Sequence, residues 1–172
     1  MSMIHINNPY TKSNVTNIQD GDVQPNAVDL RVDKILKINS DLFEISNESK
    51  KHRSSTKIEL DSEGYFNLDI GEYEVVMSNM ITIGENEAGW LVTRSTLTRN
   101  GCIIVSGLYD SGFSGFAAGT LHIKSGPVRI KHDTRLAQFI LVESKSIGMY
   151  NGDYGLNRDG EPKQMERKYV DA

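Results

Sequence analysis

Turn-forming residues interrupt this chain so often that no long amphipathic helix fits between them. Glycine, asparagine, aspartate and serine separate apolar runs of only a few residues, and several of these runs alternate imperfectly with polar side chains. Short alternating runs bounded by such residues are typical of β-strands that bury one face. The sequence therefore predicts an all-β protein rather than a helical bundle.

The expected strands are distributed along most of the chain, and two turn sequences stand between them. Asp61–Gly64 and Ser125–Pro127 have the composition of hairpin turns. The strands are expected at 27–32, 42–45, 57–60, 65–68, 73–77, 80–83, 103–105, 117–123, 128–130 and 137–142.

One segment, Thr93–Gly101, departs from the strand pattern. It begins with hydroxyl side chains that can cap a helix, and it ends with Asn100-Gly101, a favourable helix stop. A short helix or helical turn is expected there. Ser46–Thr56 is expected to be a polar, partly basic loop.

Length and charge limit the possible classes of protein. A chain of 172 residues fits one domain. We expect a folded domain over 1–150 and a polar tail over 151–172, either disordered or acting as a flap that orders over a ligand. The net charge of −4 argues against a nucleic-acid-binding basic face.

Several other features point to a cytoplasmic protein without metal-ligand clusters. No apolar run is long enough to span a bilayer, and the first residues lack the pattern of a secretory signal. The single Cys102 excludes an internal disulfide and a Cys-rich zinc site. The four histidines share no metal-ligand spacing, and no Walker A or G-x-S-x-G motif is present.

Three segments concentrate groups that could carry chemistry. Arg94–Arg99 places hydroxyls and two arginines at an expected helix start, where backbone amides and guanidinium groups favour anions. Gly107–Gly115 contains three glycines around Asp110, a possible proton acceptor, and Phe113, and these glycines allow a tight backbone and close approach of a ligand. Thr134–Gln138 is a polar entry into a strand. Each segment alone is more often a solvated helix, a plain turn or an ordinary strand entry.

Taken in order, these segments resemble the motifs of the dCTP deaminase and dUTPase superfamily. The resemblance covers roughly 24–141, most of the chain. The first to fourth motifs are matched by Asn26–Arg31, Gly89–Gly101, Leu108–Gly115 and Arg135–Gln138.

The resemblance implies a fold, an assembly and an activity. Members form a distorted β-barrel or jelly roll (the dUTPase-like β-clip) with little helix, and they assemble as homotrimers whose active sites lie between subunits. They act on pyrimidine deoxynucleoside triphosphates, with Mg²⁺ held by the phosphates and water rather than by direct protein ligands. This chemistry needs a positioned water, a carboxylate and cations, and no covalent nucleophile.

The resemblance also implies roles for individual residues. Asp110 corresponds to the residue that contacts the deoxyribose and the attacking water, and Asp29 to a supporting group of the first motif. The nucleotide-binding positions are Arg94, Ser95, Thr96, Arg99, Phe113, Gln138 and, more weakly, Tyr154 and Arg158 of the tail.

The position of one carboxylate separates the two branches of the superfamily. Deaminases carry a glutamate shortly after the third motif, and the matching position here is Thr120, with no acidic residue between Ser111 and Lys131. A threonine hydroxyl is not a general base near neutral pH. The sequence therefore favours a dUTP diphosphatase that yields dUMP and pyrophosphate. Two alternatives remain: a dCTP deaminase, with or without dUTP hydrolysis as a second activity, which Arg99 favours, and an inactive nucleotide-binding regulator.

Overall fold

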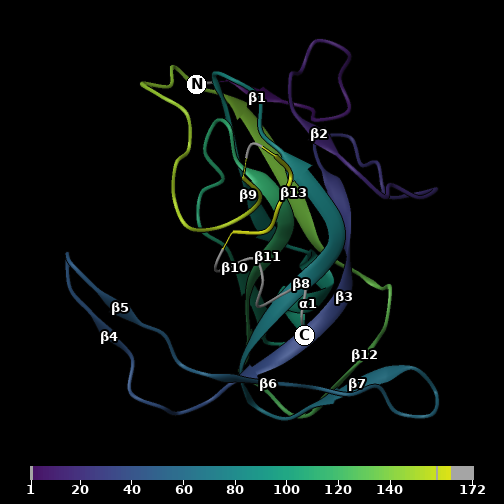
Figure 1. Cartoon of the computed structure of the whole chain (residues 1–172). Coiled ribbons are helices and arrows are strands. Elements are labelled where there is room, and N and C mark those ends of the chain that lie inside the picture. The colour runs from purple at the N-terminus through teal and green to yellow at the C-terminus, as the bar shows by residue number, and fades with distance from the viewer. Residues whose placement is uncertain (1, 158, 164–172) are drawn as a thin grey trace.

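The computed structural model describes residues 2–157 and 159–163, and in this part of the chain the fold is nearly all β (Figure 1). The longer strands are β3 (Val28–Ile38), β8 (Gly71–Thr82), β9 (Glu87–Thr93), β11 (Ser114–Ile123) and β13 (Arg135–Glu143). The shorter strands are β1 (Met3–Ile4), β2 (Asn14–Val15), β4 (Glu44–Ile45), β5 (Lys50–Lys51), β6 (Ser55–Lys57), β7 (Tyr65–Leu68), β10 (Cys102–Val105) and β12 (Val128–Lys131). The helix α1 spans Ser95–Arg99. The all-β prediction is confirmed.

Antiparallel pairing arranges most of these strands in one nine-stranded sheet. The strand order is β1-β13-β3-β8-β11-β10, while β2, β6 and β9 pair with β8, β3 and β13. Two further pairs, β7–β12 and β4–β5, form separate two-stranded sheets. This jelly-roll-like arrangement fits the expected fold, although its sheets do not close into a barrel within the described residues.

Hydrogen bonds join β9 and β10, the two edge strands that would pair in a closed barrel. The Thr93 hydroxyl of β9 donates to the Ile104 carbonyl of β10 at 2.9 Å and accepts from the Ile104 amide at 2.8 Å. Beyond β10, Tyr109 and Gly89 exchange two backbone hydrogen bonds of 2.8 and 3.0 Å. These contacts bring the segment that contains Asp110 against the start of β9.

The inward faces of the long strands form one hydrophobic core. Leu30, Met77, Leu121 and Phe139 come from four different strands, and each is almost completely buried. Burial of a side chain of this size stabilises the fold by roughly 1.5–3 kcal/mol. The core therefore holds β3, β8, β11 and β13 in fixed register, and the loops that carry polar residues depend on that register.

Several local predictions from the sequence were wrong at strand boundaries. The segments expected as 73–77 and 80–83 are one continuous strand, β8, in which Ser78 and Asn79 keep the strand conformation at the irregularity opposite Phe116–Ala118. Asn79 is buried, and its side chain accepts from the Arg31 amide and donates to the Thr16 carbonyl. Strand β9 was missed.

The helix was predicted at the correct place and with the correct C-terminal end, but its N-cap residue was predicted wrongly. Arg94 occupies the N-cap position, and its side chain makes no capping hydrogen bond. Asn100 occupies the C-cap, and Gly101 has a φ of +71°, the left-handed conformation that glycine favours.

The expected hairpin turns and polar loop also differ from the structure. Asp61–Gly64 is a tight turn, in which the Gly64 amide donates to the Asp61 carbonyl at 2.9 Å. However, neither turn is a hairpin. The first turn joins β6 to β7 and the second joins β11 to β12, whereas β7 and β12 pair with each other. The loop expected at 46–56 contributes β5 and part of β6, and β4 and β5 form a projecting arm (Figure 1).

The described part of the tail returns to the body of the protein. The Tyr150 amide donates to the Ser111 carbonyl at 2.7 Å, and the Leu156 amide donates to the Ser114 carbonyl at 2.6 Å. Gly155 has a φ of +77°, and an added Cβ there would lie 2.2 Å from the Ser114 oxygen. Close backbone approach at this position therefore requires glycine.

Candidate functional site

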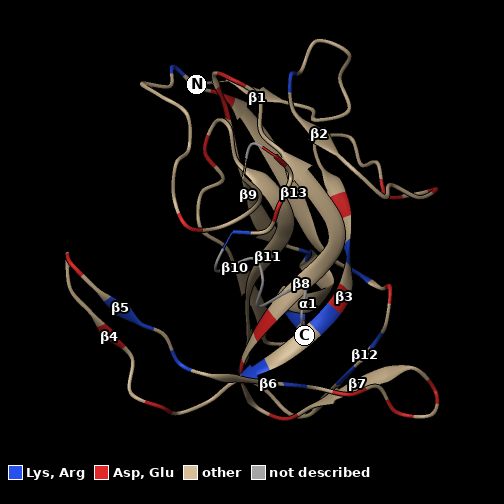
Figure 2. Cartoon of the chain, viewed as in Figure 1, with Lys and Arg blue, Asp and Glu red and all other residues tan. Residues whose placement is uncertain are grey.

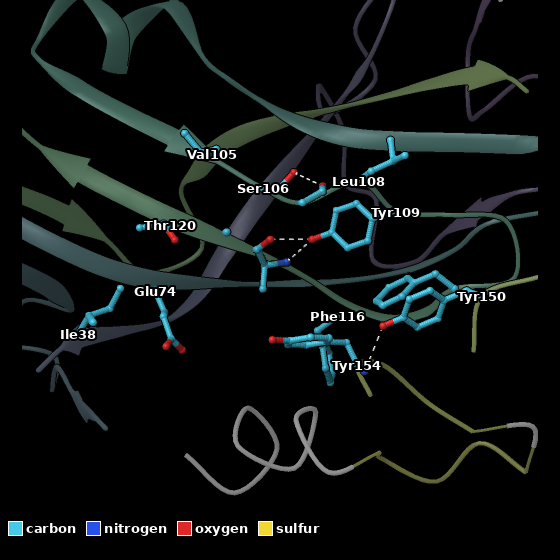
Figure 3. A pocket seen from close by; sticks show the side chains of 14 residues that line it. Ile38, Glu74, Val105, Ser106, Leu108, Tyr109, Phe116, Thr120, Tyr150 and Tyr154 are labelled. Carbon is cyan, nitrogen blue, oxygen red and sulfur yellow. Dashed lines mark hydrogen bonds between the residues drawn. The ribbon is translucent and has the colours of Figure 1, made fainter. Parts of the chain in front are cut away.

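A pocket lined by aromatic rings lies between β10, β11 and the beginning of the tail (Figure 3). Its volume is about 480 Å³, and its rings come from Tyr109, Phe113, Phe116, Tyr150 and Tyr154. We call this cavity the aromatic pocket. Its size and flat walls suit an uncharged planar ligand such as a nucleobase.

The aromatic wall is fixed by edge-to-face packing. The ring centroid of Phe113 lies 4.9 Å from that of Tyr109 and 5.6 Å from that of Tyr150. Phe113 is 6% exposed, so it contributes an edge of the wall rather than an open stacking face. The third motif and the tail therefore meet in one packed unit.

Tyr109 is held by the backbone of β11. Its hydroxyl donates to the Ala118 carbonyl at 2.6 Å and accepts from the Ala118 amide at 2.9 Å. The pairing of β11 with β8 shifts between Phe116 and Ala118, so a bulge accompanies this contact. β-Bulges redirect backbone groups locally. Tyr109 therefore uses a backbone donor and acceptor that the bulge turns toward the pocket.

Asp110 lies at the edge of this unit with its side chain exposed. It lines a neighbouring groove of about 420 Å³ formed with the 144–150 segment, and Tyr150 lines both this groove and the aromatic pocket. The loop is fixed from behind, because the buried Ser111 hydroxyl donates to the Glu87 carbonyl at 2.7 Å. A carboxylate that is exposed on a fixed loop can accept a proton from water.

A second group of candidate residues surrounds a buried carboxylate on β3. Asp29 is completely buried, and its Oδ2 atom lies 3.2 Å from Arg94 Nε and 3.5 Å from Arg135 Nη1. Arg94 also donates to the Arg135 carbonyl at 2.8 Å, and Arg135 donates to the Gly21 carbonyl at 2.6 Å. We call Asp29, Arg94 and Arg135 the arginine–aspartate cluster.

The other candidates from the second and fourth motifs lie beside this cluster. Gln138 is half-buried and stands opposite Asp29 in the pairing of β13 with β3. Ser95, Thr96 and Arg99 lie on α1, and all three are exposed. The amides that begin a helix have no partner within the helix. The exposed side of α1 therefore offers hydroxyl, amide and guanidinium donors to an anion.

The structure keeps the two groups of candidates apart within one chain. Tyr109 is paired with Gly89, and Arg94 lies five residues further along the chain than Gly89. At about 3.3 Å per residue this separation is about 16 Å. Because the pairing is antiparallel, the chain runs from Tyr109 to Asp110 in the direction opposite to that from Gly89 to Arg94, so Asp110 lies on the far side of this pair from Arg94. Asp110 and Arg94 of one chain therefore do not face one phosphorus atom.

The tail candidates differ in what the structure describes. Tyr154 is 37% exposed and lines the aromatic pocket, and its amide donates to the Tyr150 hydroxyl at 3.2 Å. Lys50 of the projecting arm lies 3.8 Å from Asp153. Arg158 lies outside the described residues.

Two pKa shifts characterise the electrostatics of these regions. Burial raises the pKa of Tyr154, and the charges of Tyr150, Asp153 and Glu74 raise it further. Near the arginine–aspartate cluster, burial acts to raise the pKa of Asp22, but hydrogen bonds from Arg31 and the Gln19 amide outweigh it and lower that pKa. Asp22 is therefore ionised at neutral pH and Tyr154 is protonated.

The residues fit a metal ion that arrives with its substrate better than a resident one. No group of three histidine, cysteine or acidic residues is placed to hold a metal within the described residues. Mg²⁺ is commonly bound through substrate phosphates, waters and one or two carboxylates. The exposed Asp110 is one carboxylate that could contact the water shell of such an ion.

Sequence reasoning missed three residues that the structure brings to these regions. Tyr150 joins the aromatic pocket to the Asp110 groove, Glu74 lines the aromatic pocket from β8, and Arg135 shares Asp29 with Arg94. Arg135 lies within the fourth motif, so that motif was a usable signal. Glu74 and Tyr150 lie outside the motifs, and only tertiary contacts place them.

Two solved structures share this all-β, jelly-roll-like fold. A dCTP deaminase from Agrobacterium tumefaciens matches with a TM-score of 0.56 and 15% identity, over 76% of this chain and 43% of that one. A mutant dUTPase from phage phi11 of S. aureus matches with a TM-score of 0.52 and 11% identity, over 82% and 96% of the two chains.

Sequence comparison then gives the family. The model of the dCTP deaminase-like family matches residues 6–144, and the chain belongs to this family. A deoxyuridine 5'-triphosphate nucleotidohydrolase of Methanocaldococcus jannaschii is 32% identical over 147 residues, which cover 84% of this chain and 94% of the relative. A probable enzyme of the same name from Halobacterium salinarum is 29% identical over 151 residues, 84% of this chain and 90% of the relative.

No described helix has the length and apolar character needed to cross a membrane. Basic and acidic residues are both distributed along the chain, including the projecting arm (Figure 2). The expected cytoplasmic location stays a prediction.

Proposed function

We propose that this protein is a dUTP diphosphatase that hydrolyses dUTP to dUMP and pyrophosphate. The names of its relatives and the resemblance of its four motifs support this substrate. The observation that carries the chemistry is the exposed Asp110 carboxylate beside a pocket of nucleobase size. The uracil would occupy the aromatic pocket, with Phe113 and Tyr154 in its wall.

Asp110 is assigned the role of general base. Its carboxylate takes a proton from a water molecule that attacks the α-phosphorus. The bond from that phosphorus to the oxygen bridging to the β-phosphate breaks, and pyrophosphate leaves with the electron pair. General-base catalysis of this kind contributes about 10²–10⁴-fold to a rate. When bound to the triphosphate, Mg²⁺ would neutralise the charge that develops on the phosphate oxygens.

The triphosphate is assigned to the face beside the arginine–aspartate cluster. Ser95 and Thr96 supply exposed donors there, Gln138 and Arg99 lie on the same side, and Arg94 is oriented by the buried Asp29. Asp29 thus acts through Arg94 rather than by contact with the nucleotide. Arg158 is carried as a further phosphate contact on the motif resemblance alone.

Separation of the two regions supports sites shared between copies of the chain. Because about 16 Å lies between Gly89 and Arg94 of one chain, the phosphate donors would come from a second copy. A cyclic homotrimer would repeat this contact three times and leave no open edge, which agrees with the implied assembly.

Release of pyrophosphate from dUTP in the presence of Mg²⁺ is the direct test. We expect turnover by the wild-type protein and a loss of about 10²–10⁴-fold in kcat for Asp110→Asn. Asp69→Asn is the matched control, because Asp69 is also exposed but lines neither the aromatic pocket nor the Asp110 groove and does not belong to the arginine–aspartate cluster. Binding of dUTP without pyrophosphate release would instead support a regulator.

A further inference from the structure

The groove beside Asp110 contains a second charged residue, Lys145, which lies in none of the four motifs. Among the described residues that line this groove, Asp110 and Lys145 are the only charged ones, and the rest of its wall consists of serines, a glycine, a tyrosine and apolar side chains. Tyr150 lines both the groove and the aromatic pocket, so a ligand can extend from one cavity into the other. Lys145 therefore lies beside the path of a nucleotide whose base occupies the aromatic pocket.

The backbone on both sides of Lys145 is anchored to one residue of the turn before β9. The Ser144 amide donates to the Asn86 carbonyl at 2.7 Å, and the Ser146 amide donates to Asn86 Oδ1 at 3.2 Å. Asn86 has a φ of +64°, in the left-handed region that asparagine tolerates better than most residues. The backbone of Lys145 is thus held in place, while its side chain is exposed.

A pair of hydroxyls connects this anchored segment to the Asp110 loop. The Ser111 and Ser146 hydroxyl oxygens lie 2.6 Å apart. Because the buried Ser111 hydroxyl donates to the Glu87 carbonyl at 2.7 Å, Ser146 is the donor within the pair. Asp110 directly precedes Ser111, and Lys145 directly precedes Ser146. The contact between the two serines therefore fixes the backbones of the acid and the lysine relative to each other.

The ammonium group of Lys145 is suited to bind an anion in this groove. Within the described part of the chain, no acidic side chain forms an ion pair with Lys145. A lysine ammonium is a compact positive charge that donates several hydrogen bonds, and it commonly binds phosphate oxygens. A carboxylate and an ammonium in one groove match a phosphate whose attacking water contacts the acid and whose oxygens contact the cation.

We propose that Lys145 binds a nonbridging oxygen of the α-phosphate, in the same chain as the Asp110 that activates the water. The inference rests on the proposed function, because it adds a contact to that substrate. Lys145 neutralises charge on the α-phosphate as the water attacks, and the donors beside Arg94 of a second copy hold the rest of the triphosphate. Base and α-phosphate are then bound by one chain.

The affinities of deoxyuridine and dUMP separate a phosphate contact from any other role of Lys145. The two ligands share base and sugar, and only dUMP carries the α-phosphate. We expect wild-type protein to bind dUMP more tightly than deoxyuridine in calorimetric titrations. In Lys145→Gln this preference should fall about 10-fold, the lower end of what a hydrogen bond to a charged group contributes. The affinity for deoxyuridine should not change.

Turnover of dUTP gives a second readout. Lys145→Gln should lower kcat/KM for pyrophosphate release by about 10-fold or more, and Lys145→Arg should retain most of the wild-type value because the positive charge remains. Lys57→Gln is the matched control, since Lys57 is also exposed but lines neither the aromatic pocket nor the Asp110 groove. It should leave turnover and both affinities unchanged. Unfolding temperatures verify that all variants fold.

Different results would overturn the inference and the proposed function. If wild-type protein hydrolyses dUTP and Lys145→Gln keeps both its turnover and its preference for dUMP, the role of Lys145 is wrong and the proposed function stands. An equal loss of affinity for deoxyuridine and dUMP would likewise overturn the phosphate contact, because the substitution would then act on the pocket itself. Absence of pyrophosphate release from the wild type would overturn the proposed function and this inference with it.

Discussion

The aromatic pocket and the arginine–aspartate cluster are built in opposite ways. The pocket is assembled from β8, β10, β11 and the tail of one chain, and its rings pack against one another. The cluster is organised around the single buried carboxylate of Asp29, and the donors beside it on α1 face solvent. One region encloses space for a ligand within the chain, while the other presents an open charged surface.

This difference indicates how binding and chemistry are divided. A planar base can be enclosed by one chain, because apolar burial needs only neighbouring side chains. Hydrolysis of a phosphate bond also needs cations and an acid around one phosphorus atom, and in one chain the strand from Gly89, beside the Asp110 loop, to Arg94 is about 16 Å long. We therefore expect base binding to be a property of the single chain and turnover to be a property of the assembly.

Mixed assemblies provide the largest expected effect. Asp110→Asn and Arg94→Ala should each lose most turnover as pure proteins. When the two are co-refolded, about a quarter of the sites in random mixed trimers should regain both native residues, because each residue comes from a different copy. Pyrophosphate release by the mixture measures this recovery. A mixture as inactive as its components would place the whole site within one chain.

The two acidic residues should differ in their effect on stability. Asp29→Ala removes the carboxylate that two partly exposed arginines share, so the free energy of unfolding should fall by about 1–3 kcal/mol. Asp110→Ala removes an exposed side chain and should change it by less than about 0.5 kcal/mol. Urea unfolding at one fixed protein concentration measures both. Equal losses would show that Asp110 also supports the fold.

Attachment of the tail can be weakened without a substitution among the residues that line the aromatic pocket. Gly155→Ala places a Cβ 2.2 Å from the Ser114 oxygen at a φ of +77°, so Tyr154 should be displaced. We expect kcat/KM for dUTP to fall about 10-fold, because an enclosing segment no longer excludes water. Gly160→Ala is the matched control, since its φ is +82° but its Cβ would meet nothing. An equal loss in both variants would assign the effect to backbone strain alone.

Acid should affect the charged region in a defined direction, with the smallest effect. The pKa of Asp22 is lower in the folded protein than its usual value of about 4, so its contribution to stability is present above that pH. The contribution is lost as pH falls through the folded pKa. Asp22→Asn should therefore flatten the decrease in unfolding free energy below about pH 4. Asp20→Asn, an exposed neighbour, should retain the wild-type decrease.

The motifs predicted more of the charged region than of the pocket. Asp29, Arg94 and Gln138 were identified from local sequence, and the pairing of β3 with β13 brings Asp29 opposite Gln138. The pocket depends on residues such as Glu74 and Tyr150, which lie outside the four motifs and were given no role from the sequence. No local pattern marks them, because their proximity arises from strand register and from the return of the tail.

Strand errors had a related physical origin. β8 was divided because Ser78 and Asn79 resemble a turn, yet Asn79 bonds to Arg31 and Thr16 from other segments. The N-cap was assigned to hydroxyls, whereas Arg94 occupies it while its side chain binds Asp29 and the Arg135 carbonyl. In both places long-range polar contacts outweighed local preference.

The sequence by itself determined the all-β class, the short helix, the four motifs and the candidate acid Asp110. Alternation, turn residues and motif spacing are local properties, so they can be interpreted without coordinates. Only the tertiary structure decided that Asp110 and Arg94 of one chain lie apart and that a carboxylate from β8 stands beside Thr120. Both facts follow from strand register, which a buried core fixes between segments distant in the chain.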